Sequence, residues 1–76
     1  MSSKQTLIRE AIAHQCHRAV ATIAPDNRLT EDLGIRSLSR IELAVRLEKA
    51  LGQPVRDDQI LTAATVADVE RTLGAA

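Results

Sequence analysis

The stretch that decides the fold runs over residues 33–54 and reads LGIRSLSRIELAVRLEKALGQP. Its apolar residues recur at helical spacing. Ser37 stands just before them, where its hydroxyl can accept a hydrogen bond from an early backbone N–H. Gly52 suits the left-handed position that follows a helix, and Pro54 prevents continuation. The stretch therefore predicts a helix over 37–51 with Ser37 as its N-terminal cap.

Three further segments are helical in pattern. Residues 4–23 carry apolar side chains at steps of three and four, which predicts a first helix of that length. Residues 57–63 allow one or two turns. Residues 66–73 predict a last helix, with Thr65 as its N-cap and Asp68 in a weaker form of the capping box.

The segment between the first two predicted helices, residues 24–36, is a loop rich in turn-forming residues. It also holds Leu29, Leu33 and Ile35, which a solvated loop would not need and which we expect to fold back onto the helices. The residues expected near the buried face of helix 37–51 are Leu38, Ile41, Ala44, Val45 and Leu51, with Leu43 and Leu47 widening that face. The fold class is therefore all-α: a small four-helix bundle of three longer helices and one short helix, with a long loop between the first two.

Composition limits this chain of 76 residues and 8.2 kDa to one small domain. We expect the domain to span residues 1–76, with residues 1–3 disordered. Apolar residues make up 45% and none is aromatic, so the core must be aliphatic. Ten basic and ten acidic residues give a formal net charge of zero. This balance, without aromatic rings for base stacking, argues against a nucleic-acid binder.

The single cysteine, Cys16, excludes an intrachain disulfide and favours a reducing compartment. No apolar run is long enough for a signal peptide or a membrane span. We therefore expect a cytoplasmic protein without a membrane span.

Three spaced motifs carry a family resemblance. Residues 33–43, LGIRSLSRIEL, resemble the L-G-x-D-S-L-x-x-V-E-L motif at the second helix of acyl carrier proteins and of the related carrier domains of polyketide and non-ribosomal peptide assembly. Residues 46–58, RLEKALGQPVRDD, are similar to the family's L-E-x-x-F-G-x-x-I-x-D, and residues 65–68, TVAD, to its T-V-x-D. The resemblance covers about residues 29–73 and implies the acyl-carrier fold.

In that family the motif serine is esterified with 4′-phosphopantetheine from coenzyme A, and the resemblance places this group on Ser37. A helix N-terminus favours an attached phosphodiester because of its free N–H groups and positive dipole end. The protein would be a monomeric tether for thioesters rather than an enzyme. Its implied partners are a phosphopantetheinyl transferase, a ligase that loads acyl or aminoacyl groups, and downstream synthase and transferase enzymes. The nearby Ser39 lies off the family register and is interpreted as a surface residue.

Two features depart from the family pattern. Arg36 stands where the family usually has Asp, and it would either pair with the phosphodiester through its planar fork or lie solvated. From Arg36 to Lys49 the chain has four basic and two acidic residues, a net charge of +2 where many fatty acid carriers are acidic. This charge predicts partners with acidic or apolar docking sites and favours a specialised fatty acid or polyketide-type pathway.

Two sets of residues follow from the resemblance. The expected partner-docking residues are Arg36, Leu38, Arg40, Glu42, Val45, Arg46 and Lys49. The residues expected to line a cavity for an acyl chain between the last three helices are Val45, Ile60, Leu61, Ala64 and Val66. Ordinary core packing is the alternative for the second set.

The other reactive side chains give weaker evidence of a functional site. Cys16 and His17 adjoin, but neighbours on a helix point about 100° apart, and Cys16 lies on the apolar stripe as a small buried hydrophobe. His14 and His17 stand at i and i+3 without an evident third metal ligand. Residues 57–58, two aspartates, most simply begin the short helix. We expect neither a catalytic residue nor a metal site.

The sequence thus indicates a carrier protein with acyl cargo. The alternative is an aminoacyl or peptidyl carrier of non-ribosomal-peptide-type metabolism. More remote alternatives are an unmodified helical interaction module and a helix-turn-helix protein whose Arg36, Arg40 and Lys49 contact nucleic-acid phosphates.

Overall fold

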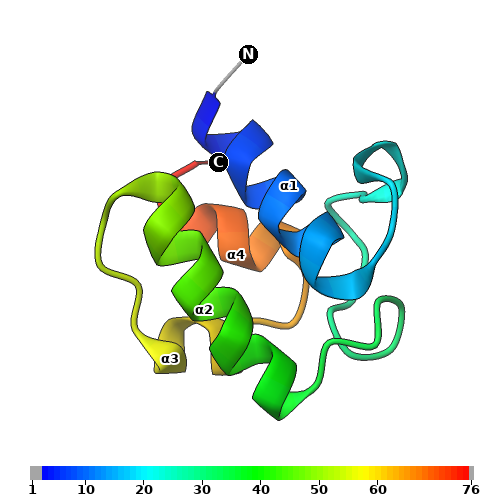
Figure 1. The fold of residues 1–76 in the computed structure, drawn as a ribbon. Coiled ribbons are helices and arrows are strands. Elements are labelled where there is room, and N and C mark those ends of the chain that lie inside the picture. The colour runs from blue at the N-terminus through cyan, green and yellow to red at the C-terminus, as the bar shows by residue number, and fades with distance from the viewer. Residues whose placement is uncertain (1–2, 76) are drawn as a thin grey trace.

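The computed structural model describes residues 3–75 and is all-helical over that part of the chain (Figure 1). Its elements are α1 (Ser3–Cys16), the short 3₁₀ turn η1 (Val20–Thr22), α2 (Ser37–Leu51), α3 (Asp57–Leu61) and α4 (Val66–Thr72). Each α-helix contacts two others, because α1 and α3 both pack against α2 and against α4. The predicted all-α four-helix bundle is confirmed. Of residues 1–3, expected to be disordered, Met1 and Ser2 lie outside the described residues and Ser3 begins α1.

The first helix is shorter than its apolar stripe predicts, and the expectation of a helix over 4–23 is wrong. The helix ends at Cys16, and His17 takes a left-handed backbone with φ 57°. The N–H of Arg18 then donates to the carbonyl of Ala13 at 3.0 Å. This bond, from the second residue past the helix to its last turn, is that of a Schellman motif. The chain leaves the helix axis at that point, and η1 replaces the last predicted turns.

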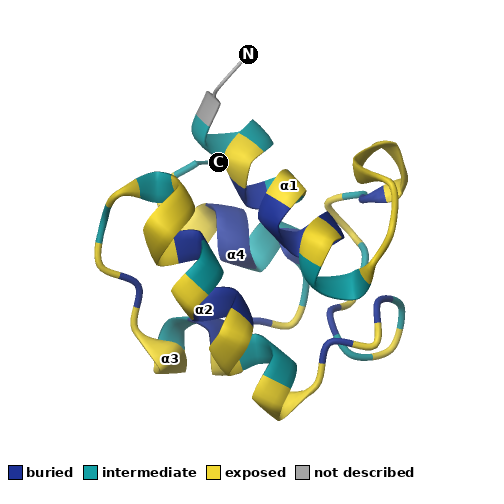
Figure 2. Cartoon of the chain, in the orientation of Figure 1, coloured by how far each residue is buried: buried dark blue, intermediate teal, exposed yellow. Residues whose placement is uncertain are grey.

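The core is aliphatic throughout, as the composition requires, and its buried bands face inward from α1, α2 and α4 (Figure 2). Leu29, Leu33 and Ile35 of the long loop are buried in it, which confirms that this loop folds back onto the helices. The other members of the buried cluster are Ile8, Ala11, Ile12, Ala13, Ile23, Leu43, Ala44, Leu47, Val55, Ile60, Ala63, Val66, Val69 and Leu73.

The buried face of α2 is narrower than the predicted one. Leu38 is 71% exposed, Val45 is 52% exposed, and Ile41 is also exposed. The residues that α2 buries are Leu43, Ala44 and Leu47. Both sets repeat at helical spacing, so periodicity alone does not distinguish them. Packing of α2 against α1 and α3 buries the second set and leaves the first as an apolar stripe on the surface.

The ends of α2 and α4 test the predicted caps. Arg36, not Ser37, occupies the N-cap position of α2, and no side chain caps that end, so the expectation that Ser37 caps the helix is wrong. Gly52 follows α2 in the left-handed conformation with φ 65°, as predicted. At α4 the N–H of Asp68 donates to Thr65 Oγ1 at 3.2 Å, and the N–H of Thr65 donates to Asp68 Oδ2 at 3.1 Å. The predicted capping box is confirmed.

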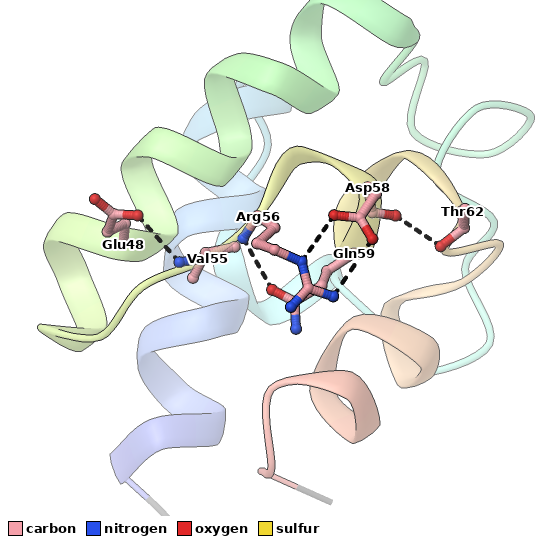
Figure 3. Close-up of polar contacts among 6 residues, drawn as sticks. All are labelled: Glu48, Val55, Arg56, Asp58, Gln59 and Thr62. Carbon is pink, nitrogen blue, oxygen red and sulfur yellow. Dashed lines mark hydrogen bonds and ion pairs between the residues drawn. The ribbon is translucent and has the colours of Figure 1, made fainter.

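The short helix α3 is held by local side-chain bonds (Figure 3). Before it, the N–H of Val55 donates to Glu48 Oε1 of α2 at 3.0 Å. The N–H of Arg56 donates to Gln59 Oε1 at 2.9 Å, and Arg56 Nε bonds Asp58 Oδ1 at 3.0 Å. The predicted aspartate pair thus begins this helix, which ends at residue 61 rather than 63.

One buried carboxylate joins α1 to α4. Glu70 is only 3% exposed, and Arg9 Nε donates to its Oε2 at 2.7 Å. Gln5 Nε2 adds a longer bond to the other carboxylate oxygen at 3.4 Å. The charge of Glu70 is therefore compensated by a partner on the neighbouring helix, as a buried carboxylate requires.

The capping carboxylate of α4 makes stability depend on pH. Backbone N–H groups of Ala64 and Thr65 donate to Asp68 and lower its pKa. The ionised carboxylate of Asp68 stabilises the folded state. This stabilisation is complete above the ordinary Asp pKa of about 3.9 and is lost as pH falls through the lowered pKa of the folded state. We expect Asp68→Ala to lower the thermal midpoint at pH 7 and the difference from wild type to shrink toward about pH 3.

Thermal melts followed by circular dichroism measure this difference. Glu10→Ala, which removes an exposed carboxylate from α1, is the matched control and should leave the midpoint within error of wild type. An equal difference between Asp68→Ala and wild type at both pH values would contradict the linkage.

Candidate functional site

Ser37 is the first residue of α2, and its side chain is exposed. The loop before it is fixed to the core two residues earlier, where Ile35 is buried and its N–H donates to the carbonyl of Leu29 at 2.8 Å. Leu29 is itself tied to the loop before α4, because its N–H donates to the carbonyl of Ala64 at 2.9 Å. The hydroxyl of Ser37 is thus accessible while its backbone is held firmly.

Arg40, one turn after Ser37, binds the end of α3. Its Nη1 lies 3.1 Å from the carbonyl oxygen of Ile60, 3.2 Å from that of Leu61 and 2.5 Å from that of Ala63. These carbonyls belong to the last turn of α3 and the segment after it, where helical backbone bonding stops. The carbonyl of Ile60 also accepts from the backbone N–H of Ala63, whereas the guanidinium is the donor to the carbonyls of Leu61 and Ala63.

The other donors of Arg40 reach back to the long loop. Nε donates to the carbonyl of Ile35 at 3.2 Å, and Nη2 donates to Thr30 Oγ1 at 3.0 Å. Arg40 therefore joins the loop, α2 and α3 around the position of Ser37. Among the expected docking residues, Arg40 makes the most hydrogen bonds to other parts of the chain that the structure describes.

A groove of about 620 Å³ opens beside Ser37. Residues 28–31 of the loop form one side, residues 61–64 form the other, and Arg36, Ser37 and Arg40 line the end at α2. Three of the lining side chains are guanidinium groups and one, Glu31, is a carboxylate. The groove is therefore electropositive. Sequence reasoning identified neither Arg28 nor Thr30, because an arginine and a threonine in a loop carry no periodic signal.

Arg36 precedes α2 and lines the groove, whereas the other expected docking residues share the outer face of the helix. They are Leu38, Glu42, Val45, Arg46 and Lys49. A second hollow of about 460 Å³ lies along this face, lined by Glu42, Val45, Arg46, Lys49 and Ala50. Gln15 of α1 bridges two of these residues. Its Nε2 donates to Glu42 Oε1 at 3.1 Å, and its Oε1 accepts from Arg46 Nε at 3.3 Å.

The five residues expected to line an acyl cavity are not brought together around one. Ile60 and Val66 are fully buried in the core, whereas Val45, Leu61 and Ala64 are exposed. Leu61 and Ala64 line the groove beside Ser37, and Val45 lines the hollow along α2. Ile60 and Val66 belong to the buried core cluster, and the cavity for an acyl chain stays a prediction.

Cys16 is half-buried against the core, and its thiol lies 3.7 Å from the carbonyl oxygen of Ala13. His14 is exposed, and His17 forms the left-handed turn after α1. Within residues 3–75 no three His, Cys, Asp or Glu side chains are grouped to hold a metal ion. None of the helices described is long and apolar enough to cross a membrane.

Comparison with known proteins gives the class. The family model for the phosphopantetheine attachment site matches residues 6–73. A protein named acyl carrier protein from Rickettsia bellii (strain RML369-C) is 37% identical over 60 residues, which cover 79% of this chain and 70% of the relative. Proteins of the same name from Sulfurovum sp. (strain NBC37-1) and Aster yellows witches'-broom phytoplasma (strain AYWB) are 33% and 36% identical, and each alignment covers about four fifths of both chains.

Fold and matches together define a small helical carrier domain. The chain belongs to the acyl carrier protein family, whose prosthetic group is 4′-phosphopantetheine. It is accordingly a carrier and not an enzyme. The residues around Ser37 fit this group, because an exposed hydroxyl at a helix N-terminus adjoins an electropositive groove suited to a phosphodiester.

The bonds of Arg40 predict a large effect on folding. We expect Arg40→Ala to lower the free energy of unfolding by about 2–3 kcal/mol, because it removes the bonds of Arg40 to all its oxygen acceptors and leaves the part-buried carbonyl of Ala63 without its donor. Arg40→Lys should recover only a small part, since one ammonium does not span the acceptors of α3 and of the loop. Urea denaturation followed by circular dichroism measures both.

Arg46→Ala is the matched control on the same helix. Arg46 makes a single side-chain bond, to Gln15, so its loss should cost less than about 1 kcal/mol. Equal stability of the Arg40→Ala and Arg46→Ala variants would show that Arg40 does not organise this end of the molecule.

Proposed function

We propose that Ser37 carries the 4′-phosphopantetheine and that the protein delivers thioester-bound intermediates to partner enzymes. The observation that carries this proposal is the exposed hydroxyl of Ser37 at the first position of α2, within the matched region. Ser39, the nearest other hydroxyl, is half-buried and lies further into the helix. One candidate is therefore presented at the helix start and the other is not.

The chain contributes position and electrostatics to this role. In the transfer, Ser37 Oγ forms a bond to phosphorus, the pyrophosphate bond of coenzyme A breaks, and adenosine 3′,5′-bisphosphate leaves. The transferase accepts the hydroxyl proton. The N–H groups of the first turn of α2 and the positive end of its dipole then face the attached phosphodiester. When bound, the group supplies the thiol that holds the cargo, and the tether raises the local concentration of cargo at each enzyme.

Partner docking is proposed on the outer face of α2. Leu38, Ile41 and Val45 form an exposed apolar stripe there. Arg46 and Lys49, with the acidic Glu42, line the hollow beside it, and Arg36 stands just before the helix. This combination suits a partner surface with an apolar centre and acidic residues around it. The proposed partners are a phosphopantetheinyl transferase, a loading ligase and downstream synthase enzymes.

The same charge supports a specialised role in fatty acid or polyketide-type metabolism. The proposed carrier is a monomeric, single-domain protein of the cytoplasm. Aminoacyl or peptidyl cargo is the alternative. The intact mass of protein purified from its own organism distinguishes the two, because the mass added beyond phosphopantetheine identifies the cargo.

The attachment point is tested by substitution. Ser37→Ala should abolish the gain of one phosphopantetheine on incubation with coenzyme A, Mg²⁺ and the organism's transferase, because it removes the nucleophilic oxygen. Intact mass spectrometry with peptide mapping measures the gain. The helical circular dichroism should stay close to that of wild type, since Ser37 is exposed and caps nothing.

Ser39→Ala is the matched control, two residues away on the same helix, and should be modified as wild type is. Loss of modification in Ser39→Ala, with modification retained in Ser37→Ala, would show that Ser39 and not Ser37 carries the group.

Docking is tested by reversing charge on α2. The double variant Arg46→Glu with Lys49→Glu should lower kcat/KM of the transferase about tenfold at low ionic strength, because both changes oppose an acidic partner surface. The effect should shrink at high salt, since these side chains face solvent and their charges are screened.

Glu10→Gln with Arg71→Gln changes two exposed charges outside α2 and serves as the control. An unchanged or raised kcat/KM in the α2 double variant would refute docking through positive charge on this face.

A further inference from the structure

The groove beside Ser37 holds more positive charge than its surroundings neutralise. None of the described carboxylates pairs with Arg36 or with Arg40, since the ion pairs among residues 3–75 involve other arginines. The bonds of Arg40 go to carbonyl and hydroxyl oxygens, which accept hydrogen bonds without cancelling its charge. Two guanidinium charges at this end of α2 therefore lack an anionic partner.

A third guanidinium, that of Arg28, lines the same groove but has a partner. Arg28 Nη2 lies 3.3 Å from Asp32 Oδ1, and bonds from the backbone N–H and side chain of Arg28 lower the pKa of Asp32. This pair fixes Arg28 at the loop side of the groove. Glu31 is the remaining carboxylate that lines the groove, so the lining retains a net positive charge even after the Arg28 pair is set aside.

Arg36 is free to turn toward an anion. It occupies the N-cap position of α2, is exposed, and makes no capping bond. Arg40 has its position fixed by five oxygen acceptors, yet Nη2 carries two hydrogens and bonds one oxygen, which leaves a donor. A mobile and a fixed guanidinium thus lie on the same groove as the hydroxyl of Ser37. Arginine forks match phosphate oxygens in charge and geometry.

We propose that this groove is a phosphodiester-binding site, in which Arg36 and Arg40 hold the phosphate of the arm attached to Ser37. The inference rests on the proposed function. The phosphate is clamped at the α2 end, and the arm runs through the groove between residues 28–31 and residues 61–64. The exposed side chains of Leu61 and Ala64 offer it an apolar wall. The arm is then folded against the protein rather than free in solvent.

The test compares amide and arginine Nε–Hε signals in ¹H–¹⁵N spectra of the unmodified and phosphopantetheinylated protein, after intact mass has verified modification. We expect modification to shift signals of residues 28–31 and 61–64 and the Nε–Hε signal of Arg40, besides those next to Ser37. In modified Arg36→Gln these remote shifts should fall by at least half. Arg46→Gln removes an arginine of the same helix outside the groove and should leave them unchanged.

Shifts confined to residues 36–40 in the modified wild type, or remote shifts that persist in Arg36→Gln, would overturn the proposal. If the wild-type protein gains no mass on incubation with coenzyme A and the transferase, the proposed function is refuted separately. The anion site in the groove is then tested on the unmodified protein. Titration of unmodified protein with inorganic phosphate at low ionic strength should shift the same groove amides, several-fold more weakly in Arg36→Gln. The absence of such shifts would overturn the anion site.

Discussion

The end of the molecule that presents Ser37 depends on the guanidinium of Arg40. Three chain segments with no regular pairing among them meet there: the long loop, the first turn of α2 and the last turn of α3. Hydrophobic packing alone would leave the carbonyls of Leu61 and Ala63, at and just past the end of α3, without the donor that Arg40 supplies. One planar group with five donors solves this, because it reaches acceptors from α3 and from the loop at once. The proposed attachment site at Ser37 is thereby built on a rigid base.

Much of the fold was predictable because local chemistry determines it. Gly52 ends α2 because glycine enters the left-handed region without steric cost, and Thr65 with Asp68 begins α4 by pairing with free N–H groups. The buried positions of Leu29, Leu33 and Ile35 followed from the cost of leaving three large apolar side chains in solvent. Ser37 was found as a candidate through the register of its motif, and the structure places it at an accessible helix start.

The remaining features depend on tertiary contacts that periodicity does not contain. His17 is not the glycine that usually occupies a left-handed position after a helix, so the end of α1 gave no signal. The apolar residues of α2 repeat on two faces, and only packing against α1 and α3 shows which face is covered. In the sequence Arg40 cannot be told from a surface arginine, because four of its five acceptors are backbone carbonyls, which every residue carries.

The apolar surface stripe of α2 bears on how long a docked partner stays bound. Its side chains, Leu38, Ile41 and Val45, are all aliphatic, and the chain contains no aromatic residue. Long-lived protein complexes are commonly anchored by Trp or Tyr side chains set deep in a partner pocket, and differences in affinity reside mostly in the dissociation rate. At the docking face proposed above, a small aliphatic contact without such an anchor releases its partner quickly. Brief residence on each enzyme suits a carrier that visits several in succession, because each departure frees it for the next.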